Sequence, residues 1–225
     1  MVTSNVIQRT VHIRYAEQIA TAFLIDVDLR QYLVTAKHVV PNLQGDGFIS
    51  IWHNNGWREV GVRLVGHAPG EADVSVLALP YRVAGADLTL PPDAAGLAVG
   101  QEVFFLGFPF GLFGEMGAAN NDYPLPFVKR ATVSCFEHNQ HGLHRIFLDG
   151  NNNPGFSGGP VVFCLPGTSE FLVAGVISGY RYENQPVFHG TELLPLSTRH
   201  NTGIIFSYGI GYATSLARGN PIGAK

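Results

Sequence analysis

The chain has 225 residues, of which 46% are hydrophobic and 14% are charged, and its formal net charge at pH 7 is -3. This balance supplies a sizeable core and excludes global disorder, and it leaves no basic surplus for a nucleic-acid backbone or an anionic membrane. The 27 glycines and 14 prolines break the chain into short segments, which favours strands joined by turns over long helices.

The sequence has no long apolar segment and only two cysteines, Cys135 and Cys164. Residues 1–18 lack the uninterrupted apolar stretch of a secretory signal, and no run reaches the roughly 18 apolar residues of a membrane-spanning helix. Two thiols form neither a disulfide framework nor the paired spacing of a structural zinc site. We therefore expect free thiols and a cytoplasmic protein, with export left open in case a leader has been removed.

Short runs rich in β-branched and aromatic residues recur between turn signals in the first third of the chain, and they predict antiparallel strands. The pairs Asp46-Gly47 and Asn55-Gly56 favour tight hairpin turns because these residue types tolerate positive φ. We expect these strands to form one barrel or curled sheet. They lie at residues 6–15, 19–27, 31–36, 47–53, 58–67 and 73–80.

Residues 84–100 lose the strand alternation and are rich in Gly, Ala, Pro and Asp, as expected of a connection across the surface. A second series of strand-like runs follows, so the sequence predicts an all-β protein of two antiparallel six-stranded β-barrels packed together, residues 1–90 and 91–225. The helical candidates are residues 39–43 and the carboxyl-terminal tail. The later strands are expected at residues 101–108, 127–136, 144–150, 159–165, 170–180 and 200–216.

The strongest local signal is Gly155-Phe156-Ser157-Gly158-Gly159-Pro160. A serine hydroxyl is a weak nucleophile, so catalysis needs a base beside it and donors directed at the oxyanion that forms. Glycines on both sides of Ser157 allow a sharp turn, in which the amides of Gly155 and Ser157 can point at one spot. The alternative interpretation is a glycine-rich hairpin turn that happens to contain a serine.

Two other residues are candidates for the partners of this serine. His38 follows the apolar run 32–36 just where the chain turns, a rigid and half-exposed place that suits a general base. A single histidine at a strand end is more often a packing or surface residue. Asp73 opens the apolar run 73–80, where a carboxylate needs a donor, and an imidazole Nδ1–H would serve.

In their order and separations along the chain, His38, Asp73 and Ser157 resemble the trypsin-like peptidase family, small bacterial members in particular. Residues 99–112 resemble the opening of the second barrel in HtrA-type proteases, and residues 149–157 resemble the approach to their nucleophile. The resemblance covers about residues 17–215 and implies a chymotrypsin-like fold with the active site in the cleft between the barrels.

The resemblance also implies a reaction, the hydrolysis of peptide bonds by a serine endopeptidase. Ser157 would attack the scissile carbonyl, His38 would take its proton and return it to the leaving amine, and Asp73 would hold the imidazole tautomer. The amides of Gly155 and Ser157 would form the oxyanion hole. We expect a protein or peptide substrate and no cofactor.

In the family that this chain resembles, the floor of the specificity pocket lies about six residues before the nucleophile, which implies a floor at Asn151. Its walls would come from residues 176–179, including Ser178 and Gly179, and from residues 209–211. Because no acidic side chain stands at the floor position, we expect cleavage after uncharged side chains rather than after lysine or arginine.

This chain departs from the related enzymes in three places. Phe156 stands where zymogen-type proteases carry an aspartate that pairs with a new amino terminus, so that activation switch is not expected. We expect no attached PDZ domain, and this expectation motivates the hypothesis of a partner protein that activates the enzyme or delivers substrates. Residues 111–127 form a long and poorly periodic segment, either a movable loop beside the active site or a solvated hairpin extension.

Competing functions make different demands on the sequence. A catalytically silent relative could bind an extended peptide by strand addition along residues 178–180. An esterase with a nucleophile elbow needs alternating strands and helices and the chain order serine, acid, histidine, and both requirements fail. His138, His141 and His144 recur every three residues, but no cysteine or acid completes a metal site, so we expect a polar hairpin there.

Overall fold

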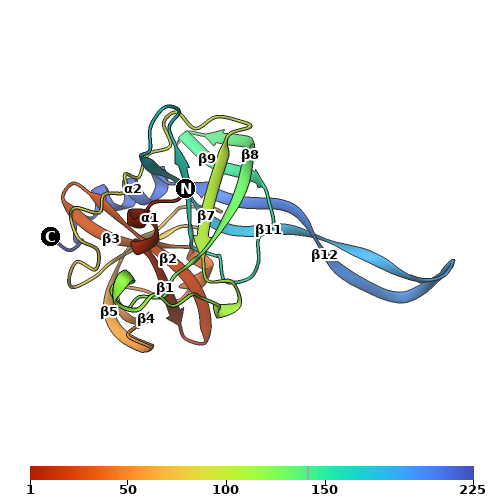
Figure 1. Cartoon of the computed structure of the whole chain (residues 1–225), viewed down its shortest axis with the longest axis horizontal. Helices are drawn as coiled ribbons and strands as arrows, with labels where there is room; N and C mark the ends of the chain where they lie inside the picture. Colours follow the sequence, from red (N-terminus) through yellow and green to blue (C-terminus); the bar gives the residue numbers. More distant parts are fainter. Residues whose placement is uncertain (141) are drawn as a thin grey trace.

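The computed structural model describes residues 1–140 and 142–225, and within these ranges its strands close into two antiparallel barrels of six strands each (Figure 1). The first barrel has the strand order β1-β2-β3-β6-β5-β4, and the second has the order β10-β11-β12-β9-β8-β7. The all-β, two-barrel prediction is therefore confirmed.

The strands of the first barrel follow the alternation of the sequence. Asn54 and Asn55, with φ values of 50° and 54°, form the two-residue turn between β4 and β5, close to the predicted Asn-Gly turn. The other predicted turn is wrong, because Asp46 and Gly47 already pair with β5. The strands are β1 (Thr10–Tyr15), β2 (Gln18–Val27), β3 (Arg30–Thr35), β4 (Asp46–His53), β5 (Gly56–His67) and β6 (Ser75–Ala78).

The second barrel closes where β10 pairs with both β7 and β11. Its inward-facing side chains are aliphatic and aromatic, with Phe105, Phe156 and Phe163 fully buried among them. The strands are β7 (Glu102–Gly107), β8 (Phe127–Asn139), β9 (Gly142–Asp149), β10 (Pro160–Cys164), β11 (Phe171–His189) and β12 (Glu192–Gly209).

Two short helices stand where the sequence predicted the ends of strands. The helix α1 (Ser4–Gln8) replaces the start of the strand expected at residues 6–15. The strand expected at residues 200–216 ends at Gly209, and α2 (Gly211–Gly219) follows and buries Tyr212, Ala213 and Ala217. The sequence analysis had named the carboxyl-terminal tail as a helical candidate. The other helical candidate, residues 39–43, is wrong, because the 3-10 turn at this place comprises residues 37–39. No helix within the described ranges has the length and apolarity needed to cross a membrane.

The connection between the barrels runs from the end of β6 to the start of β7 and contacts both barrels. Gln31 of β3 donates from Nε2 to the carbonyl of Ala84 at 3.1 Å, and Val173 of β11 donates to the carbonyl of Pro91 at 2.9 Å. One buried hydrophobic cluster contains residues of both barrels and of α2. The division between residues 90 and 91 stays a prediction.

The strands β11 and β12 extend far beyond the second barrel as a two-stranded arm, which projects away from the body of the molecule (Figure 1). We define the arm as residues 180–203. Its strands pair from Tyr182 with Asn201 to His189 with Glu192. The sequence analysis assigned only the barrel ends of these strands, because the polar and proline-containing stretch between them buries no face and so lacks the alternation of a barrel strand.

Candidate active site

His38 and Asp73 are joined by two hydrogen bonds at the mouth of the first barrel. His38 lies in the 3-10 turn after β3, and Asp73 lies just before β6, the strand that pairs with β3. The imidazole Nδ1 is 2.6 Å from Asp73 Oδ2, and the backbone amide of His38 donates to Asp73 Oδ1 at 2.8 Å. Both carboxylate oxygens therefore orient the same histidine.

The carboxyl of Asp73 is held in its ionised form. Burial by itself would raise its pKa, but the hydrogen bonds and charge of His38, together with a hydrogen bond from Ser178, outweigh burial and lower the pKa below its ordinary value. The side chain of His38 is 42% exposed while that of Asp73 is 15% exposed. The imidazole can thus reach a substrate, and its partner carboxylate is shielded.

Ser178 of β11 links this pair to Ser157. Its hydroxyl donates to Asp73 Oδ2 at 2.6 Å, and its carbonyl accepts the hydroxyl hydrogen of Ser157 at 3.2 Å. Within the described residues there is no hydrogen bond between Ser157 and His38. The structure therefore brings the three predicted residues together around Ser178, with the Ser157 hydroxyl directed at the Ser178 carbonyl. The sequence analysis placed Ser178 in a pocket wall and missed its contact with Asp73, for which the sequence holds no local signal.

Glycines determine the shape of the turn that carries Ser157. Gly155 has a φ of 104°, and a Cβ atom there would lie 2.2 Å from the carbonyl oxygen of Phe108. Gly158 has a φ of 84°, and its Cβ would lie 2.2 Å from the carbonyl oxygen of Thr21. Any side chain at these positions would collide with backbone of a neighbouring segment. The backbone amide of Thr21 also donates to the Ser157 carbonyl at 3.0 Å, which joins the turn to β2.

The two amides predicted to form an oxyanion hole are open. Within the described chain, the N–H groups of Gly155 and Ser157 donate to no protein acceptor. Between them, Phe156 is fully buried and meets Phe105 edge to face, with ring centroids 4.9 Å apart. The turn is therefore anchored by an aromatic side chain in the barrel core at the position where zymogen-type proteases carry an aspartate.

The segment predicted to form the pocket floor is held by two side chains that the sequence analysis missed. Lys129 of β8 donates from Nζ to the carbonyl of Asn151 at 2.6 Å and to Asn153 Oδ1 at 2.5 Å. Asn201 of the arm donates from Nδ2 to the carbonyl of Asn152 at 2.8 Å. Burial lowers the pKa of Lys129. Asn151 is exposed, and its role in specificity stays a prediction.

A family model described as the trypsin-like peptidase domain matches residues 20–164, more than half of the chain. The chain belongs to this family. Solved structures share its fold at 18–21% sequence identity. The comparison with curated proteins found no match.

All of these structures are of proteases, and three of them illustrate the likeness. The inactive form of the Rv3671c protease of M. tuberculosis has a TM-score of 0.59 and 19% identity, over 96% of this chain and 90% of that one. The HtrA-type protease AlgW with a tripeptide has a TM-score of 0.59 and 21% identity, and the match covers 97% of this chain and 62% of that one. The serine endoprotease from Yersinia pestis has a TM-score of 0.59 and 20% identity, and the match covers 97% of this chain and 68% of that one. The predicted resemblance to HtrA-type proteases is thus confirmed.

In this trypsin-like peptidase, the segment 111–127 packs on the first barrel. Gly114 and Leu125 exchange two backbone hydrogen bonds of 2.9 and 2.8 Å, which makes the segment a closed loop. Its far end reaches the turn between β4 and β5, where Asn54 donates to the carbonyl of Asp122 at 2.9 Å. The side chain of Phe113 contacts Trp52, with ring centroids 5.3 Å apart. The loop is therefore a packed hairpin extension in this structure, and its gating of the site stays a prediction.

The three histidines weighed as metal ligands do not form a common site in the described part of the chain. His144 is buried, with Nδ1 2.6 Å from the hydroxyl of Tyr212 and Nε2 3.3 Å from Glu71 Oε1. His138 is exposed, and His141 lies outside the described residues. Among the residues that the structure describes, no three His, Cys, Asp or Glu side chains gather into a metal site.

Proposed function

We propose that this trypsin-like peptidase is a serine endopeptidase that hydrolyses peptide bonds through an acyl-enzyme intermediate, with His38, Asp73 and Ser157 as its catalytic triad. The observation that carries the proposal is the bidentate pairing of Asp73 with His38, 2.6 Å at Nδ1, beside a serine turn whose two amides are open. Membership of the family supports the reaction class.

The first half of the reaction begins with a rotation of the Ser157 side chain, which moves its hydroxyl from the Ser178 carbonyl to Nε2 of His38. Ser157 Oγ then forms a bond to the scissile carbonyl carbon, and its proton passes to Nε2. The imidazolium is stabilised by Asp73, and the oxyanion accepts hydrogen bonds from the amides of Gly155 and Ser157. Collapse breaks the C–N bond, and the proton on His38 leaves with the amine.

In the second half, a water molecule takes the place of the amine. His38 accepts one proton of the water as its oxygen bonds to the acyl carbon, and the same two amides stabilise the second oxyanion. Collapse returns the proton to Ser157 Oγ and releases the carboxylic acid. By analogy with measured triads, loss of Ser157 or His38 is expected to lower kcat on the order of a million-fold, and loss of Asp73 roughly ten-thousand-fold.

Covalent labelling with a fluorophosphonate, followed by intact-mass measurement, tests this function. We expect one adduct on the wild-type chain, no adduct on Ser157→Ala or His38→Ala, and full labelling of Ser134→Ala, which removes an exposed hydroxyl on β8. Labelling that persists in Ser157→Ala would contradict the assignment. A folded chain that is never labelled would instead favour the alternative of a silent relative that binds peptides along residues 178–180.

A further inference from the structure

Thr21 of β2 is a buried residue whose hydroxyl bonds to two segments of the second barrel. Its exposed fraction is 0%. The hydroxyl donates to the carbonyl of Gly155 at 2.7 Å and accepts a hydrogen bond from the amide of Phe108 at 3.1 Å. One hydroxyl of the first barrel therefore joins the turn that carries the nucleophile to the segment that follows β7.

The backbone of Thr21 fixes the place of this hydroxyl. Its amide donates to the carbonyl of Ser157 at 3.0 Å, and its carbonyl accepts the hydroxyl hydrogen of Thr35 on β3 at 2.8 Å. The lack of a side chain at Gly107 leaves room for the hydroxyl, because a Cβ atom there would lie 2.7 Å from Thr21 Oγ1. The strands of the first barrel thus hold Thr21 against the nucleophile turn.

The two open amides of the turn are directed by the carbonyls of their own peptide units. A trans peptide is planar, and its N–H and C=O point in opposite directions, so a carbonyl that is held directs the amide of the next residue. The carbonyl of Pro154 accepts a hydrogen bond from the amide of Phe110 at 2.8 Å, which directs the N–H of Gly155. The carbonyl of Phe156 accepts an amide hydrogen from within the turn at 2.8 Å, which directs the N–H of Ser157.

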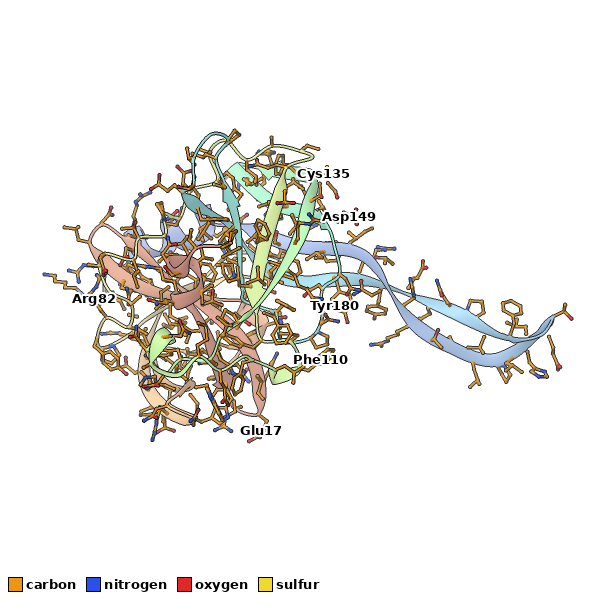
Figure 2. The ribbon with its side chains drawn as sticks, in the orientation of Figure 1. Glu17, Arg82, Phe110, Cys135, Asp149 and Tyr180 are labelled. Carbon is orange, nitrogen blue, oxygen red and sulfur yellow. The ribbon has the colours of Figure 1, made fainter. Side chains whose placement is uncertain are left out.

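The hydroxyl of Thr21 supports both of these peptide units. The carbonyl of Gly155, which it holds, belongs to the peptide unit that lies between them. Its other partner, the amide of Phe108, lies two residues before Phe110. Phe110 has a φ of 54°, which is disfavoured for a residue with a side chain, and that side chain is 66% exposed at the surface of the body (Figure 2). Since Phe110 has little packing of its own, its position depends on the segment that Thr21 holds.

We propose that Thr21 is a positioning residue for the oxyanion hole, whose hydroxyl keeps the amides of Gly155 and Ser157 directed at one spot. This proposal rests on the proposed function and adds a residue to its machinery. Because Thr21 is fully buried, it contacts no substrate and acts through the turn. Donors that are oriented in advance stabilise the charge of the transition state without having to reorganise during the reaction. A turn that has lost this hydroxyl should therefore slow the chemical step and leave substrate binding nearly unchanged.

The test removes the hydroxyl and keeps the shape of the side chain, as Thr21→Val does. The substrate is the casein peptide that the wild type cleaves fastest. We expect kcat to fall about 30-fold, less than the loss of an oxyanion donor costs, while KM changes by less than about threefold. Fluorophosphonate labelling of Ser157 should slow by a similar factor, since the phosphonyl oxygen occupies the same hole. Thr21→Ser keeps the hydroxyl and should restore most of kcat.

A matched control separates positioning from a general loss of stability. Thr10 at the start of β1 is also buried, and its hydroxyl donates to the carbonyl of Val6 at 2.9 Å. Thr10→Val should lower the free energy of unfolding, as Thr21→Val does, and leave kcat at the wild-type value. If Thr21→Val does not fold, Thr21→Ala, which leaves space for water at the two freed groups, replaces it with the same expected result. A wild-type kcat in the variant without the hydroxyl, or no recovery in Thr21→Ser, would overturn the proposal.

The two proposals fail in different ways. NMR relaxation of the Gly155 amide in the Ser157→Ala variant needs no catalysis. We expect an order parameter of about 0.85 with Thr21 in place, and one below about 0.6 after the further change Thr21→Val. If the wild type is never labelled at Ser157 but this difference is found, the proposed reaction fails and Thr21 still orders the turn. If the wild type is labelled and the two order parameters are equal, the positioning role fails and the reaction stands.

Discussion

The hydroxyl of Ser178 lies 2.6 Å from Oδ2 of Asp73, and this contact joins the second barrel to the first. Asp73 thus receives a hydrogen bond from His38 on its own barrel and another from β11, the strand whose Ser178 carbonyl contacts Ser157. At the site this contact adds to the hydrogen bond between the Thr21 amide and the Ser157 carbonyl, which also joins the two barrels. Removal of the Ser178 hydroxyl is the most direct test of how the site is aligned.

The variant Ser178→Ala keeps the carbonyl that Ser157 contacts and removes the hydroxyl that donates to Asp73. A hydrogen bond to a charged group contributes about 1.5–3 kcal/mol, so we expect kcat/KM to fall roughly tenfold or more while the fold is retained. Because that bond lowers the pKa of Asp73, its loss should raise this pKa, which an NMR titration of the Asp73 carboxyl measures. An Asp73 pKa equal to that of the wild type would contradict this role.

His12 on β1 makes stability sensitive to acid. It is buried with both ring nitrogens lacking a hydrogen-bond partner within the described chain, and it stacks on Phe108 with ring centroids 4.3 Å apart. Burial lowers its pKa from 6.5 to about 4. The unfolded chain therefore takes up this proton first, and the neutral-imidazole contribution to stability, present above pH 6.5, is lost as pH falls toward 4.

The variant His12→Phe keeps an aromatic ring beside Phe108 and removes the titration. We expect the wild type to lose on the order of 3 kcal/mol more than this variant between pH 7 and pH 4, from about 1.4 kcal/mol per pKa unit. Urea unfolding of both proteins at the two pH values measures the difference. Parallel losses in the two proteins would show that other groups govern the acid response.

Arg9 anchors the connection between the barrels. Its guanidinium is fully buried, pairs with Asp26 and donates to the carbonyl of Leu88. The variant Arg9→Met leaves the carboxylate with Arg82 alone, and we expect the free energy of unfolding to fall by about 2–4 kcal/mol. As a matched control, Arg63→Met removes an exposed pair with Asp46 and should change stability by less than about 1 kcal/mol. Equal effects in urea unfolding would rule out an anchoring role for Arg9.

Lys129 places a positive charge beside the segment predicted to form the pocket floor. A second cation would be repelled there, so we expect peptides with lysine or arginine before the scissile bond to be cleaved at least tenfold more slowly than those with valine or alanine. The variant Lys129→Gln keeps hydrogen-bond donors for Asn151 and Asn153 and should narrow this ratio. Cleavage of a peptide library, followed by mass spectrometry, measures this ratio in the wild type and in Lys129→Gln. A preference of the wild type for lysine would contradict the pocket assignment.

Local patterns in the sequence predicted most of the fold and the candidate active-site residues. The alternation of apolar residues predicted the barrel strands, the glycine-flanked Ser157 predicted a sharp turn, and an aspartate opening an apolar strand predicted a paired carboxylate. Each of these signals lies within about ten residues of sequence. The wrong predictions concern α1 and α2, which lie next to strands in the sequence. Because these helices are short, their apolar residues fit the period of a strand as well as that of a helix.

The sequence by itself determined the two-barrel class, the turn that holds Ser157, and His38 and Asp73 as its candidate partners, because burial periodicity and turn chemistry are written in neighbouring residues. Only the tertiary structure decided that Ser178 contacts both Asp73 and Ser157, that Lys129 and Asn201 hold the segment predicted to form the pocket floor, and that β11 continues as a free edge along the arm. These features are hydrogen bonds between polar groups far apart in the chain, or backbone groups without a partner strand. Neither kind of feature produces a repeating pattern of apolar residues in the sequence, because both depend on where the folded barrels place the chain.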